Sequence, residues 1–468
     1  MVRTVPTNSI IPQYVTAHAN EIIPLSDRQD MELRSPSQGL LFGRGDMEFR
    51  WSPNNSIHFN LGNLPVKEIF KLNASNEQDV ILNVPTNPPI SLDVRINGSS
   101  FNIVSGGESK AILLGLVSET RFDKEILCDE LKFHIVNLHN FIGRSIDYPP
   151  HESSQSSAAR RIALSDDNWD ITIDGVENLK ELLDELAREG GYAITHVGIL
   201  RKRDNQPFRA SEALEQMALL GFFLSFVEGR WCHPIFLIGL RKGEIIFRDL
   251  SSRHRVTQWD TNWRWSPSEA NYLDLAYKGF VSKWNDPNWR ETIALILEFY
   301  IRANIYHVVE LSVLDSFTAM DRFASAYSLE NVGSANERIR RTLALAGMDR
   351  QRPNRELCIF FEEFYNRYCP PRKIADGATI LTDFRHGVVH GNRGISTGDE
   401  RDRMKNRPKL DDDSDATNPI LPFPLRIHAM QYGLWCVEMS LLYLIGYNGR
   451  YNDRITRAQD VLIHWSTP

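Results

Sequence analysis

Residues 289–329, WRETIALILEFYIRANIYHVVELSVLDSFTAMDRFASAYSL, decide the fold class of the C-terminal part of the chain. Apolar residues recur at intervals of three and four over roughly forty positions, which is the spacing at which one face of an α-helix meets a core. Helices of globular domains rarely run beyond about 25 residues without a capping signal. We therefore expect a break near Asn304 and two successive helices.

Further helical patterns continue toward the C-terminus. They occupy residues 335–348, 355–369, 373–391 and 425–447, and the last of these is strongly apolar. Pro370 and Pro371 end the second of them, because the residue before a proline disfavours the helical conformation. A charged insertion at about 392–422 is predicted to be mobile. The pattern predicts an all-α domain over residues 289–468.

The part of the chain before residue 289 has a different texture. From about Met31 to Ile142, short runs such as SIHFNL and SLDVRI alternate apolar and polar residues between turn signals, which predicts a β-rich domain over 1–145 with a sandwich or barrel arrangement. A Ser- and Pro-rich segment follows, which is predicted to be a linker or a long loop, and then an α+β region over 165–285 with a hairpin at Lys242-Gly243. The predicted fold class is multidomain α+β.

Composition limits the possible partners and location. The chain has 468 residues, a formal net charge of −7 and five cysteines without a CxxC pair. A net negative charge does not suggest that a large part of the surface is basic and binds nucleic acid, so any RNA contact must be local. The cysteines favour a reducing compartment rather than a disulfide scaffold. With no signal peptide and no apolar stretch near the roughly 18 residues that span a bilayer, we expect a cytoplasmic protein without a membrane partner.

The segment LTDFRHGVVHGNR, residues 381–393, concentrates titratable and basic groups within the predicted helical domain. RNA cleavage without a metal needs a base for the ribose 2′-hydroxyl, an acid for the leaving 5′-oxygen and a cation for the phosphate. Histidine titrates near neutrality and suits the first two tasks. Arginine is a permanently charged, forked phosphate ligand. Arg385 and His390 are therefore candidate catalytic residues, provided that Gly387 lets them share a face.

Arg385, His386 and His390 in this helical setting resemble the R-x4-6-H motif of HEPN domains, and the β-rich start of the chain resembles the ApeA-like branch of that family. The resemblance implies a HEPN-like bundle that dimerises and cleaves RNA, leaving a 2′,3′-cyclic phosphate, without a metal or cofactor. His390 would be the base or acid, Arg385 would hold the phosphate and His386 would assist.

The resemblance also implies accessory residues. HEPN sites often include an acidic residue from an earlier helix, and the candidates here are Glu310, Asp315 and Asp321, with Asp315 preferred. Asn392 is a possible accessory donor. The implied function is a ribonuclease of anti-phage defence that acts by abortive infection. By analogy with multidomain defence proteins, the N-terminal region would sense a phage-derived or small-molecule trigger, or hold the nuclease inactive.

Three alternatives compete with this interpretation. His390-Gly391 suits the C-terminal end of a helix, where glycine and a basic side chain are both favoured, and Arg385 would then be structural. The bundle could also bind RNA or a protein partner without catalysis. Finally, His386 and His390 are four residues apart and could ligate zinc, although Gly387 stands where a zinc protease has its general base.

Overall fold

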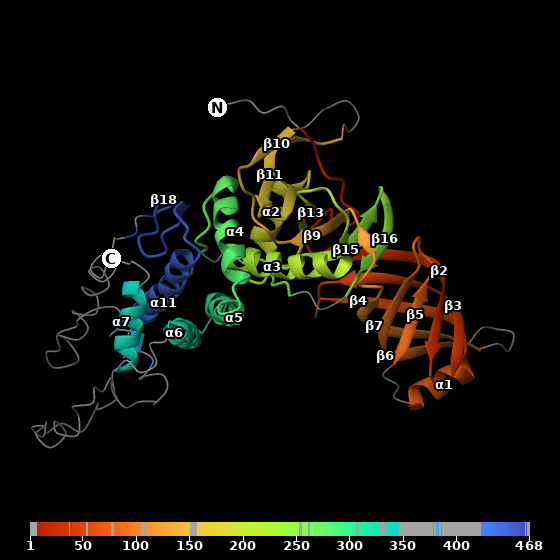
Figure 1. The fold of residues 1–468 in the computed structure, drawn as a ribbon. Coiled ribbons are helices and arrows are strands. Elements are labelled where there is room, and N and C mark those ends of the chain that lie inside the picture. Colours follow the sequence, from red (N-terminus) through yellow and green to blue (C-terminus); the bar gives the residue numbers. More distant parts are fainter. Residues whose placement is uncertain are drawn as a thin grey trace, which may run out of the picture. The chain divides into compact units, whose positions relative to one another are not determined.

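The computed structural model describes two compact units of the chain (Figure 1). The described residues are 7–345 apart from 37, 53–54, 76–78, 104–108, 150–156, 252–254, 261–262, 306–307 and 328–332, and then 378, 381–382, 385 and 423–465 apart from 464. The first unit comprises Met1–Leu224, Trp231–Thr261 and Ser268–Asp274, and the second comprises Ser225–Arg230, Asn262–Pro267 and Leu275–Pro468.

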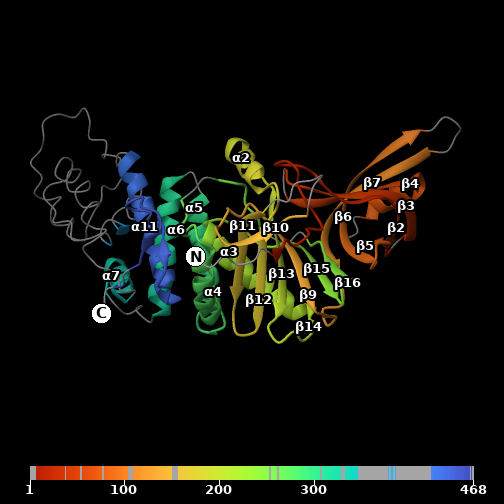
Figure 2. The ribbon, with the colours of Figure 1, turned by 90° about the horizontal axis from the view of Figure 1, so that it is seen from above.

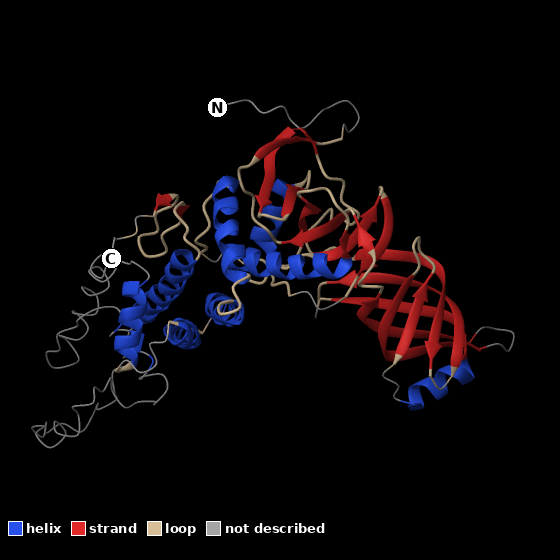
Figure 3. Ribbon diagram, viewed as in Figure 1, coloured by secondary structure: helices blue, strands red, loops and turns tan. Residues whose placement is uncertain are grey.

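The N-terminal strands of the first unit form a closed six-stranded antiparallel barrel, in the order β2-β3-β4-β7-β6-β5 (Figure 3). The elements are β2 (Ile23–Ser35), β3 (Gly39–Arg50), β4 (Ser56–Pro65), α1 (Val66–Ser75), β5 (Val80–Val84), β6 (Ile90–Ile103) and β7 (Ser109–Arg121). Buried and partly exposed residues alternate along the strands, because successive side chains point to opposite faces. The prediction of a β-rich region from alternating residues is confirmed. Because β2 also pairs with β5, the barrel is closed and its sheet has no unpaired edge strand.

The rest of the first unit is an eight-stranded sheet, in the order β1-β10-β11-β12-β13-β9-β15-β16. Its strands are β1 (Thr7–Asn8), β9 (Glu130–Val136), β10 (Arg144–Asp147), β11 (Ser157–Ser165), β12 (Trp169–Gly175), β13 (Ile194–Lys202), β15 (Ile235–Arg241) and β16 (Glu244–Asp249). Every pairing is antiparallel except β1 with β10. A separate two-stranded pair joins β8 (Leu127–Cys128) and β14 (Phe208–Arg209).

Local predictions in this region have mixed outcomes. Helix α2 (Leu179–Glu189) lies in the region predicted to be α+β, and the hairpin is confirmed with positive φ at both Lys242 and Gly243, as a tight two-residue turn requires. The Ser- and Pro-rich segment lies between β10 and β11, which pair antiparallel in one sheet, so of its two predicted roles the long loop agrees with the structure. Composition marks a loop there, but it cannot show that the flanking residues hydrogen-bond to each other.

The described part of the second unit is mainly helical. Its helices are α5 (Arg290–Ile305), α6 (Val309–Ala326), α7 (Ala335–Leu345) and α11 (Phe423–Leu444), and α4 (Ala270–Trp284) enters it from the first unit. The short strands β17 (Arg450–Tyr451) and β18 (Val461–Leu462) pair after α11. The predicted break is confirmed, since α5 ends at Ile305 and α6 begins at Val309. The chain is therefore mixed α+β, with a β-rich start and helices toward the C-terminus.

Helices α5, α6 and α11 lie side by side in the second unit (Figure 2). Their approach depends on small residues. A Cβ added at Gly433 of α11 would lie 2.3 Å from Ser316 Oγ and 3.1 Å from Ser316 Cβ of α6, so a larger residue would have to displace the Ser316 side chain. Buried residues such as Val313, Met320 and Leu434 fill the surrounding core. At this point the two helices therefore approach closely.

Helix α3 (Ala210–Glu228) is long and apolar enough, by length and composition, to cross a bilayer. Two thirds of its most apolar window, 67%, is buried inside the protein, as in a core helix. Its apolar residues therefore have protein neighbours, and the cytoplasmic location stays a prediction.

Two adjacent leucines in β7 test the barrel register. Leu113 is 0% exposed and Leu114 is 44% exposed, because they point to opposite faces of the strand. We expect Leu113→Ala to lower the free energy of unfolding by about 2–5 kcal/mol, because it leaves a cavity in the core. Leu114→Ala should change it by less than about 0.5 kcal/mol. Equilibrium urea unfolding of the two variants measures both, and equal losses would contradict this register.

Candidate functional site

Four residues of the predicted motif helix are described, and all four are helical: Ala378, Leu381, Thr382 and Arg385. Their spacing places them on one side of a helix. Thr382 Oγ1 donates to the Ala378 carbonyl at 2.8 Å, a bond that spans one helical turn. Leu381 is buried, and a Cβ added at Gly433 would lie 3.4 Å from its side chain. This side of the segment therefore packs against α11.

Arg385 is half-buried and contacts α6. Its guanidinium carbon lies 4.8 Å from the centre of the Phe317 ring, and such cation–π contacts contribute about 0.5–2 kcal/mol. The other predicted motif residues, His386, His390 and Asn392, lie outside the described residues. Of the three predicted catalytic side chains, the structure thus locates Arg385 and gives it a neighbour on α6.

The three candidate acids on α6 differ in their angle around the helix. At about 100° per residue, Glu310 lies about 20° and Asp321 about 40° from Phe317, whereas Asp315 lies about 160° away. Arg385 packs over Phe317, so the face of α6 that it covers is the face of Glu310 and Asp321. The preference for Asp315 among the accessory acids thus has no support from the position of Arg385.

Each of these acids has an arginine partner from a different element. Arg426 of α11 donates to Glu310, and Arg338 of α7 donates to Asp321 Oδ1 at 3.0 Å. Burial alone would raise the pKa of Glu310, but the hydrogen bond and the charge of Arg426 outweigh it and lower that pKa. Glu310 is thus held ionised. An ionised carboxylate can orient a cation, but it has no proton to donate.

Asp315 has the opposite electrostatic character. It is buried, and its Oδ2 lies 3.3 Å from Arg302 Nε of α5. Burial raises the pKa of Asp315, and the charge of Arg302 compensates only in part. A carboxyl with a raised pKa can act as a proton donor. Here, however, it faces α5, on the side of α6 away from Phe317.

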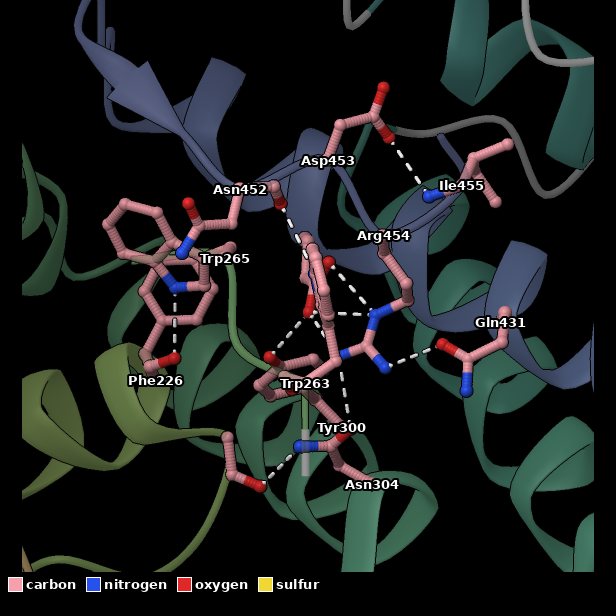
Figure 4. Close-up of polar contacts among 12 residues, drawn as sticks. Phe226, Trp263, Trp265, Tyr300, Asn304, Gln431, Asn452, Asp453, Arg454 and Ile455 are labelled. Atoms are coloured by element: carbon pink, nitrogen blue, oxygen red, sulfur yellow. Dashed lines mark hydrogen bonds and ion pairs between the residues drawn. The ribbon is translucent and has the colours of Figure 1, made fainter. Parts of the chain in front are cut away.

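A second polar cluster lies deep in the helical unit, around Glu438 of α11 and Arg454 (Figure 4). Their side chains are 2% and 1% exposed. Arg454 Nε lies 3.2 Å from both carboxylate oxygens, and its Nη2 lies 2.6 Å from Oε1. Tyr300 of α5 donates to the same Oε1 at 2.8 Å. Burial, with the nearby Glu438 charge, raises the pKa of Tyr300 well above its ordinary value, so its hydroxyl remains a donor.

Arg454 also binds three neutral acceptors. Its Nη2 donates to Asn304 Oδ1 and to the Trp263 carbonyl, each at 3.0 Å, and its Nη1 donates to Gln431 Oε1 at 2.9 Å. The Asn304 amide in turn donates to the Gly229 carbonyl at 2.8 Å (Figure 4). Because the charges are buried and satisfied, this cluster is built to hold segments together rather than to bind a substrate.

Sequence reasoning did not identify this cluster. One signal was available, since Glu438 interrupts the apolar run LWCVEMSLLYL and a buried carboxylate must have a partner. The identity of that partner, 16 residues further along the chain, follows from the fold alone. As for metals, no group of three or more His, Cys, Asp or Glu that could hold an ion occurs within the part of the chain that the structure describes. The His386–His390 pair lies outside that part.

Two family models match separate segments of the chain. One is described as the YopA central domain and matches residues 123–262, which include most of the eight-stranded sheet. The other is described as the YopA C-terminal domain and matches residues 415–464, which include α11 and both Glu438 and Arg454. Together they match less than half of the chain, and neither description names a HEPN domain.

The chain is also similar to a curated protein over most of its length. This relative is the SPbeta prophage-derived uncharacterized protein YopA of Bacillus subtilis (strain 168), which is 26% identical over 401 residues. The similarity covers 82% of this chain and 80% of that protein. No solved structure matches the chain.

The buried ion pair gives a stability prediction. Glu438→Gln leaves the Arg454 charge without its counterion, so we expect it to cost about 3–5 kcal/mol in the free energy of unfolding. The double variant Glu438→Leu with Arg454→Met removes both charges and should recover part of that loss. Glu337→Gln, which breaks an exposed ion pair on α7, should leave the urea midpoint unchanged. A loss for Glu438→Gln no larger than that of Glu337→Gln would refute the structural role.

The opposite pKa shifts of Asp315 and Glu310 give a pH prediction. Asp315 has a raised folded-state pKa, so its ionisation disfavours the fold once the pH rises through that pKa. Asp315→Asn should therefore raise the melting temperature at pH 7, and the gain should vanish below the unfolded pKa of 3.8.

Glu310 has a lowered pKa, so its contribution to the stability of the fold is present above pH 4.5 and is lost as the pH falls through the folded-state pKa. Glu310→Gln should accordingly lower the melting temperature at pH 7 but not in acid, and changes of the same sign in both variants would contradict the assignment.

Proposed function

We propose that the helical unit is a metal-independent endoribonuclease of the HEPN type. One observation carries the proposal: the first motif residue, Arg385, is on a helical segment and lies half-buried against α6, on the face that also bears Glu310 and Asp321. The Arg385 charge is thereby partly shielded from solvent by its contact with Phe317. A low-dielectric setting strengthens its attraction for a phosphate.

In the proposed reaction, the ribose 2′-oxygen attacks the adjacent phosphorus and the bond from phosphorus to the 5′-oxygen breaks. One imidazole accepts the 2′-hydroxyl proton, and an acid returns a proton to the leaving 5′-oxygen. The products are a 2′,3′-cyclic phosphate and a 5′-hydroxyl. Arg385 would hold the phosphate, while the HEPN resemblance assigns the base or acid role to His390 and assisting roles to His386 and Asn392.

Glu310 is the better candidate for an accessory acid than Asp315. It shares the Phe317 face of α6, and Arg426 keeps it ionised. A fixed carboxylate and its arginine could orient Arg385 or add a second cation for the phosphate. The proposed site thus comprises Arg385, His390, His386 and the Glu310–Arg426 pair, with a second copy of the chain supplying the facing motif in a homodimer.

A role in the conflict between phages and bacteria is the proposed biological setting. The relative that covers most of the chain is described as prophage-derived. A prophage gains if a competing phage fails to replicate in its host, and RNA cleavage on infection would achieve that. The N-terminal unit would then sense the trigger or restrain the nuclease, and we propose the cytoplasm as the location.

A non-catalytic module that binds RNA or protein is the second candidate. The observation that favours it is the contact of Arg385 with Phe317, because a guanidinium already packed on a ring can serve the fold alone. The two candidates differ in one measurable property, which is the rate of RNA cleavage.

Purified full-length protein should cleave single-stranded RNA in the presence of EDTA. His390→Ala and Arg385→Ala should each slow cleavage by about 10²–10⁴-fold, because an acid–base group or a phosphate ligand is lost. A 2′-deoxy substitution at the scissile nucleotide should block cleavage there, since no nucleophile remains. Product ends identified by mass spectrometry should carry a 2′,3′-cyclic phosphate.

The matched control is Arg341→Ala, which removes an exposed arginine of α7 that pairs with Glu337 of the same helix. It should cleave RNA like the wild type. RNA binding without cleavage by the wild-type protein would favour the second candidate. Unfolding of His390→Ala would favour a helix-end role for that residue.

A further inference from the structure

A groove of about 580 Å³ lies in the first unit, between the N-terminal segment and the start of α2. We call residues 9–17 the N-terminal strap. The strap contributes Ile10, Ile11 and Val15 to the lining of the groove, which also includes Tyr148 and Val176. The volume falls in the range of small-molecule sites, about 300–1,000 Å³. The groove is thus large enough to hold a ligand the size of a drug molecule.

Hydrogen bonds from backbone amides hold the strap in place. Its apolar side chains take no part in these bonds, and they line the groove. Ser9 N donates to the Asp147 carbonyl at 2.8 Å, and Ile10 N donates to Asp174 Oδ2 at 2.8 Å. Ile11 remains 67% exposed and Val15 58% exposed, although both line the groove. Apolar side chains held rigidly at a concave surface gain from being covered by a ligand.

The charged residues that line the groove are both acidic, and the Arg160 guanidinium lies beside them on backbone carbonyls. Among the described residues that line it, the charged ones are Glu177 and Glu181, at the start of α2. Arg160 donates to the backbone carbonyls of Val176 and Glu177, at 3.1 and 2.9 Å. Glu181 is exposed and lies one helical turn beyond Glu177 in the chain. An apolar wall with carboxylates at its edge complements a molecule with an apolar body and a positive charge.

We propose that this groove binds a small organic cation, an amine or guanidine on an apolar body, with the body against Ile11 and Val15 and the charge at Glu181. The proposal is independent of RNA cleavage. A small molecule fits better than an added peptide strand, because the strap backbone is already engaged. Gln13 N and Tyr14 N both donate to His134 Nε2, at 3.2 and 3.1 Å, which leaves no hydrogen-bonding ladder at these positions.

Isothermal titration calorimetry of the full chain tests the proposal with two probes that share one apolar body, 4-phenylbutylamine and 4-phenylbutyrate. The amine should bind, and the carboxylate should bind at least about tenfold more weakly, because the glutamates repel it. Ile11→Ser should weaken amine binding by about fivefold or more through lost apolar contact. Glu181→Gln should weaken it by about threefold to fivefold.

Glu189→Gln, an exposed glutamate at the other end of α2, is the matched control and should bind the amine like the wild type. Ile11 and Glu181 are both exposed, so their variants should melt like the wild type and any loss of affinity reports on the groove. Three outcomes would overturn the proposal: no heat of binding at millimolar amine, equal affinities for the two probes, or wild-type affinity in both groove variants.

Discussion

The buried pair of Glu438 and Arg454 is the constraint on which the helical unit depends. Removing two charges from water costs several kcal/mol per ion, and mutual attraction offsets that cost only when the geometry is good and the remaining donors are satisfied. Arg454 meets both conditions, with Glu438 on one side and neutral acceptors on the other. Although burial alone would lower the pKa of Arg454, Glu438 raises it, so the pair stays ionised. The segment after α11 is thereby joined to α5 in a single arrangement.

With that arrangement set, α6 becomes the wall of the proposed nuclease site. Three arginines from three different helices approach its acids, namely Arg302, Arg338 and Arg426. Two of these pairs lie on the Phe317 face, where Arg385 packs, and one lies on the α5 side. Charges of this kind can organise a phosphate site because their positions are fixed before a ligand arrives. Fixed charges of this kind would also suit a purely structural contact. The rate of RNA cleavage therefore distinguishes the nuclease from the non-catalytic module.

The first unit holds its N-terminal strap with one neutral polar group and one ion pair. His134 is fully buried in β9, and burial lowers its pKa to about 3, so its ring is neutral. Its Nε2 accepts from two backbone amides of the N-terminal strap, and its Nδ1 then donates to the Phe236 carbonyl at 3.2 Å. Asp174 holds the strap at Ile10 and is itself paired with Arg161. These bonds fix the backbone of the strap, whose Ile11 and Val15 line the groove.

The sequence by itself determined the type of most elements that the structure describes, since the helical period of residues 289–329 and the alternation in the barrel strands are local properties. It also singled out Arg385 and a break near Asn304. The tertiary structure alone decided which strands pair across the Pro- and Ser-rich loop, which face of α6 Arg385 covers, and which arginine neutralises Glu438. These depend on contacts between residues far apart in the chain. A residue's own neighbours in sequence establish its period and its burial, but the position of a partner follows only once the intervening chain has packed.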